Sequence, residues 1–151
     1  MTISGPIINI DDDEDDHEII IAVCEKLGIG KYLKCFRDGE EALQYLRVSH
    51  EYPAIILCDV NMPKITGFGL RKTINANNTL RERSVPFIFY STAAEYLQVQ
   101  EAYRMTVQGF FLKGTTFEEA ERTLKVILDY WLLCKHPNSF VNNGIVTNII
   151  K

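Results

Sequence analysis

Five short apolar runs recur along the chain, and each is followed by polar residues. The runs occupy residues 7–10, 32–36, 54–58, 87–90 and 109–112. Runs of this length that are rich in β-branched and aromatic residues are typical of strands. Where a run is apolar throughout, rather than alternating with polar residues, it indicates a strand buried on both faces of a sheet.

Segments with apolar residues at helical spacing separate these runs. Ile19, Val23 and Leu27 lie one helical turn apart, and Gly28 provides a usual helix stop. Thr116 and Glu119 have the spacing of a capping box for a last helix that reaches about residue 134. Further helices are predicted at residues 41–48, 68–76 and 95–106. Residues 81–84 are expected to form a connector, and Pro137 to close the folded part.

Strands that alternate with helices predict βαβ units, right-handed crossovers and one parallel sheet covered on both faces. In such sheets, ligands bind beyond the carboxyl ends of the strands. Asp11, Asp59, Ser91 and Lys113 each follow a different predicted strand. We therefore expect these four side chains to meet at one edge of the sheet.

The composition fits one domain of 151 residues with a net charge of −4. Residues 11–16 and Glu18 supply seven of the 20 acidic residues, so the remainder has 16 basic against 13 acidic residues, a net charge of +3. No basic block suggests direct contact with nucleic acid, and no apolar run or leading segment suggests membrane insertion or export. The four cysteines form no CxxC pair and are expected to be buried, reduced thiols, which favours a cytoplasmic protein.

The residues expected at the strand ends have a coherent chemistry. Asp11, Asp12 and Asp59 offer the hard oxygen ligands that suit Mg²⁺, whereas zinc would require His or Cys. Lys113 offers a positive charge to a phosphoryl oxygen, and Ser91 offers a hydrogen-bond donor. Such a set can position and neutralise a phosphoryl group, and an aspartate can itself accept one.

Four blocks of sequence resemble the receiver domain of two-component response regulators. They are residues 10–13 (Ile-Asp-Asp-Asp), residues 59–63 (Asp-Val-Asn-Met-Pro) with Gly67, residues 86–91 and residues 109–113. The blocks match in order and at compatible spacing, and the resemblance covers about residues 5–134, which leaves residues 135–151 as a C-terminal tail. It implies a flavodoxin-like, doubly wound sheet of five parallel strands in the order 2-1-3-4-5.

The resemblance also implies a function for the site. Asp59 would accept a phosphoryl group from a phosphohistidine of a sensor histidine kinase or phosphotransfer protein. Asp11, Asp12, Asp59 and the backbone carbonyl of Asn61 would hold Mg²⁺, while Lys113 and Ser91 would contact the phosphoryl oxygens. Ser91 would be coupled to Phe110 as a switch that changes a surface for a downstream protein partner. Such a chain is a single-domain signalling protein rather than an enzyme.

Several alternatives remain open at this stage. A Mg²⁺-dependent phosphatase of the haloacid-dehalogenase type would fit Asp11 and Asp13 as a DxD pair, but Glu14 and Asp15 stand where that family usually has Thr or Val. A pseudo-receiver would bind partners without phosphorylation, which the intact Asp59 argues against. Thr92 is an alternative to Ser91 as the functional hydroxyl, and Phe110 is equally compatible with a core residue.

Other positions have less specific interpretations. The family usually has proline after the lysine, so Gly114 predicts a trans Lys113–Gly114 bond. Residues 13–16 are expected to be solvated acids at a helix start, and His17 an exposed helix residue. Residues 130–132 would cover the core or form a homodimer surface. In the tail, residues 145–150 are expected to be a mobile terminus, with pairing as an edge strand or packing on a partner as the alternative.

Overall fold

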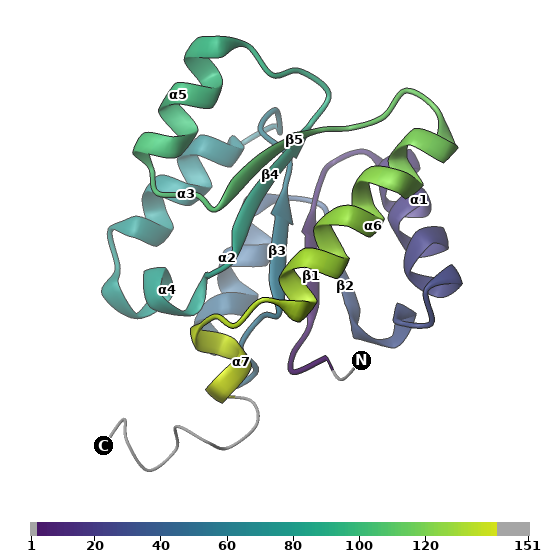
Figure 1. Cartoon of the computed structure of the whole chain (residues 1–151). Coiled ribbons are helices and arrows are strands. Elements are labelled where there is room, and N and C mark those ends of the chain that lie inside the picture. Colours follow the sequence, from purple (N-terminus) through teal and green to yellow (C-terminus); the bar gives the residue numbers. More distant parts are fainter. Residues whose placement is uncertain (1–2, 142–151) are drawn as a thin grey trace.

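Five parallel strands form a single sheet in the computed structural model, which describes residues 3–141. Their spatial order is β2 (Leu33–Phe36), β1 (Ile7–Ile10), β3 (Ile55–Cys58), β4 (Phe87–Ser91) and β5 (Gly109–Leu112). The register pairs Ile10 with Cys58 and Ser91 with Leu112, so the carboxyl ends of the strands lie at one edge of the sheet. The predicted strand order 2-1-3-4-5 is confirmed (Figure 1).

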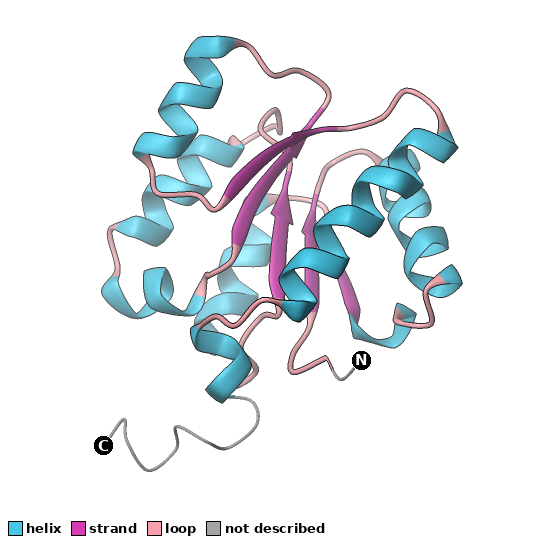
Figure 2. Cartoon of the chain, in the orientation of Figure 1, coloured by secondary structure: helices cyan, strands magenta, loops and turns pink. Residues whose placement is uncertain are grey.

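Helices cover both faces of the sheet, as Figures 1 and 2 show. One face packs against α1 (Glu14–Lys26) and α6 (Phe117–Leu133), which also contact each other. The other face packs against α2 (Gly39–Val48), α3 (Gly67–Asn75), α4 (Asn78–Arg83) and α5 (Tyr96–Arg104). Alternate residues of β3 enter the two cores, since Ile55 and Leu57 face α1 and α6 while Ile56 and Cys58 face the other helices.

Two predictions about the bounds of elements are wrong. The expected connector at residues 81–84 largely belongs to α4, because the Asn77 side chain accepts a hydrogen bond from the Leu80 amide (3.0 Å) and thereby caps a new helix. Leu80 is buried and anchors this helix to the core. Residue 32, expected in the second strand, lies instead in a short 3₁₀ helix, η1 (Gly30–Tyr32).

The folded part also continues past Pro137, where we expected it to close. Pro137 begins a short helix, α7 (Pro137–Val141), as proline readily does at a first helical position. The buried Asn138 side chain donates hydrogen bonds to the carbonyls of Pro53 (2.9 Å) and Arg83 (2.7 Å). These carbonyls precede β3 and β4, so α7 is attached at the amino ends of the strands (Figure 1).

All four cysteines are free thiols, as expected, but only Cys24 and Cys58 are buried. Cys35 is exposed because it lies on β2, an edge strand, and Cys134 is half-buried at the end of α6. Within residues 3–141, no helix has the length and apolar character that crossing a bilayer requires. Residues 145–150, for which the sequence left a mobile terminus or an edge strand open, lie outside the described residues.

Candidate functional site at the carboxyl ends of the strands

Three carboxylates meet where β1 and β3 end. Asp11, Asp12 and Asp59 each offer an oxygen atom, and these atoms lie within 4.8 Å of one another. The backbone fixes two of them, because the Asp11 amide donates to Phe36 O (3.0 Å) and the Asp59 amide donates to Ile10 O (2.9 Å). Asp11 is buried and Asp12 is exposed, so the cluster is open to solvent on one side. The predicted convergence of these acids is present in the structure.

Lys113 places its ammonium group beside this cluster. Its Nζ atom lies 2.5 Å from Asp11 Oδ2, 2.8 Å from Asp16 Oδ2 and 3.4 Å from Asp59 Oδ2, and its side chain is only 5% exposed. Burial lowers the pKa of Lys113, but the hydrogen bonds to Asp11 and Asp16 outweigh that effect and hold the pKa above its usual value. Lys113 is therefore a permanent positive charge within the acidic cluster.

Asp11 is the most strongly desolvated acid of the cluster. Burial raises its pKa to about 6, although the hydrogen bond and charge of Lys113 act in the opposite direction. The nearby charge of Asp59 adds to the increase. A bound divalent cation would stabilise the ionised form of Asp11, which burial disfavours.

Asp59 has one fixed oxygen and one freer oxygen. Oδ1 accepts a hydrogen bond from the Val60 amide at 2.8 Å, whereas Oδ2 faces Lys113. The following loop returns closely against this segment, since the Gly67 amide donates to Val60 O (2.8 Å). A Cβ atom on Gly67 would collide with the carbonyl oxygen of Asp59, so glycine is required for this close approach.

The structure distinguishes the two candidate hydroxyls. Ser91, at the end of β4, is fully buried and its Oγ atom has no hydrogen-bond partner among the described residues. Thr92 is exposed. A buried donor without a partner is costly and calls for an explanation, which a ligand at the site would provide. Lys113 N donates to Ser91 O at 2.8 Å, so the two residues are adjacent on neighbouring strands.

The two other predicted residues lie outside the acidic cluster. Asn61 is exposed in the loop after β3, so only its backbone carbonyl was expected to act. Phe110 is half-buried and packs against Phe89, with 5.9 Å between the ring centroids. It therefore belongs partly to the core, which leaves its role as a switch a prediction.

Sequence reasoning missed two residues at the start of α1. Asp16, expected to be solvated, pairs with Lys113 and has a side chain that is 25% exposed. His17, expected to be exposed, is buried: its Nε2 atom donates to the Asp11 carbonyl (2.6 Å), and its Nδ1 accepts from the Asn9 side chain (3.1 Å). The signal for His17 was present, because it continues the buried stripe of Ile20 and Cys24 back by one helical turn.

Gly114 accounts for the close approach of α6 to the site. A Cβ atom at this position would lie 2.5 Å from Glu119 Cβ and 2.6 Å from the Ala120 amide nitrogen. The predicted trans Lys113–Gly114 bond is confirmed, since the cis bond in residues 3–141 is Val85–Pro86. The Thr116 hydroxyl accepts a hydrogen bond from the Glu119 amide (3.2 Å), which confirms the predicted cap of α6.

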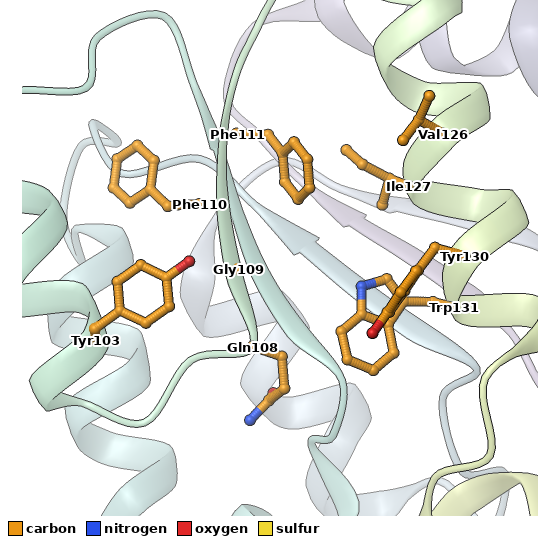
Figure 3. A pocket seen from close by; sticks show the side chains of 9 residues that line it. All are labelled: Tyr103, Gln108, Gly109, Phe110, Phe111, Val126, Ile127, Tyr130 and Trp131. Atoms are coloured by element: carbon orange, nitrogen blue, oxygen red, sulfur yellow. The ribbon is translucent and has the colours of Figure 1, made fainter.

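A second, apolar concavity lies away from the acids, over β5 and between α5 and α6. We call it the β5 groove; its volume is about 340 Å³. Figure 3 shows Tyr103 and Phe110 on one side of the strand and Phe111, Ile127, Tyr130 and Trp131 on the other. Trp131 packs partly on the core, whereas Tyr130 is 61% exposed.

Comparisons with known proteins identify this architecture. The model of the response regulator receiver domain matches residues 7–125. The chain belongs to the response regulator receiver family. It is therefore a two-component signalling domain, a class that acts with histidine kinases or phosphotransfer proteins and is generally not classed as an enzyme.

Individual relatives agree with this assignment. The chain is 30% identical over 131 residues to the probable methanogenesis regulatory protein FilR2 of Methanothrix harundinacea, covering 83% of each chain. Its fold resembles that of the phosphorylated cyanobacterial phytochrome response regulator RcpA, with 26% identity, a TM-score of 0.79, and coverage of 88% of this chain and 98% of that one. The Mn²⁺-bound form of the response regulator Rcp1 gives 25% identity, a TM-score of 0.74, and coverage of 88% and 99%.

Proposed function

We propose that this receiver accepts a phosphoryl group on Asp59 from a phosphohistidine of a sensor histidine kinase or phosphotransfer protein. The observation that carries the proposal is the position of Asp59 Oδ2, which faces the buried Lys113 at the edge of a three-acid cluster. In the transfer, the bond between phosphorus and the histidine nitrogen breaks, and a bond between phosphorus and an Asp59 oxygen forms. In this proposal, residues 5–134 form the receiver unit and residues 135–151 its tail.

Asp11, Asp12 and Asp59 would hold Mg²⁺, together with the backbone carbonyl of Asn61. The donor set fits, because three carboxylate oxygens lie within 4.8 Å of one another and all are hard ligands. The Mn²⁺-bound form of the similar protein Rcp1 supports a divalent cation at such a site. Bound there, Mg²⁺ would supply neutralisation of the negative charge on the phosphoryl oxygens.

Lys113 and Ser91 would bind the phosphoryl oxygens. Lys113 remains protonated and is held by β5, so it provides a fixed positive charge. Ser91 would donate the hydrogen bond that its buried Oγ does not make within residues 3–141. Together they would orient the phosphoryl group on Asp59. Because Ser91 ends β4 and Lys113 follows β5, phosphorylation would change the contacts at the ends of both strands.

The output would be a change on the face formed by α5, β5 and α6. The phosphoryl group would pull the Ser91 side chain toward Asp59. Phe110, which lies two positions before Leu112, the strand partner of Ser91, would then repack. Phe110 lines the β5 groove, so its movement would alter the apolar surface offered to a downstream protein or to a second receiver (Figure 3). Because Phe110 lacks a hydroxyl, this switch would depend on packing alone.

Intact-mass measurement after incubation with Mg²⁺ and acetyl phosphate tests the proposal. Wild-type protein should gain one phosphoryl group, and Asp59→Asn should gain none. Asp129→Asn, which removes an exposed carboxylate from α6, should label like the wild type. Labelling that survives in Asp59→Asn but disappears in Asp11→Asn would instead support the phosphatase. No labelling under any of these conditions would support a pseudo-receiver.

A further inference from the structure

Asp16 is an acid of this site that lies outside the four sequence blocks of the receiver resemblance and outside the acidic cluster. Lys113 has three carboxylate neighbours, of which Asp11 and Asp59 belong to the acidic cluster and Asp16 does not. We infer that Asp16 is a positioning residue that holds Lys113 on the α1 side of the site and competes with the phosphoryl group for it. The inference rests on the proposed function.

The start of α1 directs Asp16 toward the site. Asp13 caps the helix by accepting a hydrogen bond from the Asp15 amide (2.9 Å), and Asp16 follows in the first turn. From there its Oδ2 atom reaches Lys113 Nζ, 97 residues away in the chain, at 2.8 Å. Asp15, its neighbour in the same turn, is exposed. The acids of this turn are therefore not equivalent.

The competition follows from the partners that each of the three acids has in the site. Asp11 Oδ1 already accepts a hydrogen bond from the Asp13 amide (3.0 Å). With a cation in the cluster, the carboxylates of Asp11 and Asp59 would bind that cation. Asp16 would then be the partner whose charge remains available to Lys113. Nζ lies 2.5 Å from Asp11, 2.8 Å from Asp16 and 3.4 Å from Asp59, so two acids hold the lysine away from Asp59, and of these two only Asp16 is outside the acidic cluster. To bind a phosphoryl oxygen at Asp59, Lys113 would have to give up part of its contact with Asp16.

Removal of this charge should therefore free Lys113 for the phosphoryl donor. For a pair that is partly exposed, the competing interaction is worth a factor of about two to five. We expect Asp16→Asn to lower the KM for acetyl phosphate by about this factor at fixed Mg²⁺. The affinity for Mn²⁺, measured by electron paramagnetic resonance, should stay within about two-fold, because Asp16 is outside the cluster.

The matched control is Asp15→Asn in the full chain. It removes the same charge from the same helical turn without touching Lys113, so it measures the general electrostatic effect alone. Asp16→Glu should restore the wild-type KM because it retains the charge. At neutral pH, the carbon resonance next to Lys113 Nζ should shift in Asp16→Asn but not in Asp15→Asn, which detects the ion pair without phosphorylation.

The outcomes separate the inference from the function on which it rests. Equal KM values in Asp16→Asn and Asp15→Asn, or an unchanged Lys113 carbon resonance in Asp16→Asn, would overturn the role of Asp16 while labelling of Asp59 continued. A KM that falls in Asp16→Asn alone and returns in Asp16→Glu would establish it. A wild-type protein that is never labelled on Asp59 would overturn the proposed function and this inference with it.

Discussion

Gly114 shows how one residue controls the distance between the acidic cluster and α6. We expect Gly114→Ala to lower the free energy of unfolding by about 1–3 kcal/mol, because the new methyl group would meet the backbone of α6. Urea unfolding would measure this loss. Gly39→Ala is the control: its Cβ would lie 3.4 Å from Ile65 Cβ, close to an ordinary contact, and should change stability by less than about 0.5 kcal/mol.

The site residues differ in how far the sequence reveals them. Asp11, Asp59, Ser91 and Lys113 were predictable because each ends a strand, and parallel strands bring their carboxyl ends together. Asp16 was not, since six consecutive acids look alike in sequence. Which of them faces Lys113 depends on the rotation of α1 about its axis. That rotation is set by packing, including the buried hydrogen bonds of His17.

Arg71 makes a polar connection between α3 and the end of α5. It lies on α3, is 1% exposed, and donates hydrogen bonds to the carbonyls of Met105 (3.2 Å), Thr106 (3.2 Å) and Ser84 (3.3 Å). Burial, with a smaller contribution from Arg81, lowers its pKa to about 10. Arg71 therefore stays charged at neutral pH and satisfies carbonyls at the end of α5.

We expect Arg71→Met to reduce the free energy of unfolding by about 2–4 kcal/mol, because buried carbonyls would lose their donors. Lys72→Met, on the exposed side of the same helix, should change it by less than about 0.5 kcal/mol. Hydrogen exchange should show faster opening at the end of α5 in the first variant only. Equal stability of the two variants would contradict the role given to Arg71.

At the scale of elements, long buried segments were predictable and short polar ones were not. The core helices have apolar residues at regular spacing, so their existence followed from the pattern. α4 has one buried residue, Leu80. Its cap, Asn77, follows the C-cap residue of α3 and in the sequence is equally compatible with the end of that helix. α7 depends on Asn138 finding two carbonyls from distant segments, which no local pattern encodes.

Metal binding should couple the whole molecule to pH through Asp11. Its pKa is about 6 in the folded protein against a reference of 3.8, so protonation favours the folded, metal-free form. Between about pH 4 and 6, this group therefore takes stability away from the metal-free protein as the pH rises. A cation in the acidic cluster would reverse that contribution by favouring the ionised carboxylate.

The affinity for Mg²⁺ should accordingly fall about ten-fold for each pH unit below 6, because one proton must leave Asp11 as the metal binds. Calorimetric titration at pH 5 and 7.5 in two buffers of different ionisation enthalpy would detect both the affinity change and the released proton. The same titration of Asp129→Asn provides a control for surface charge. A Mg²⁺ affinity that is constant over this range would contradict the assignment of Asp11.

The architecture as a whole was the most predictable level. Alternation of strands and helices determines a parallel sheet with two covered faces, and the family resemblance supplies the strand order. What neither supplies is the exposure of individual side chains at sheet edges. The predicted order already places β2 at an edge, but the apolar neighbours of Cys35 suggested a buried thiol, whereas its side chain is exposed.

The attachment of α7 through Asn138 has a practical consequence for experiments on signalling. This helix lies at the amino ends of the strands (Figure 1), whereas Asp59 directly follows the carboxyl end of β3. A dye or a biosensor tether attached through Pro137→Cys, at an exposed position, would therefore be separated from the acidic cluster by the length of the sheet. Immobilised in that orientation, the receiver would present its acidic end to a kinase in the flowing solution.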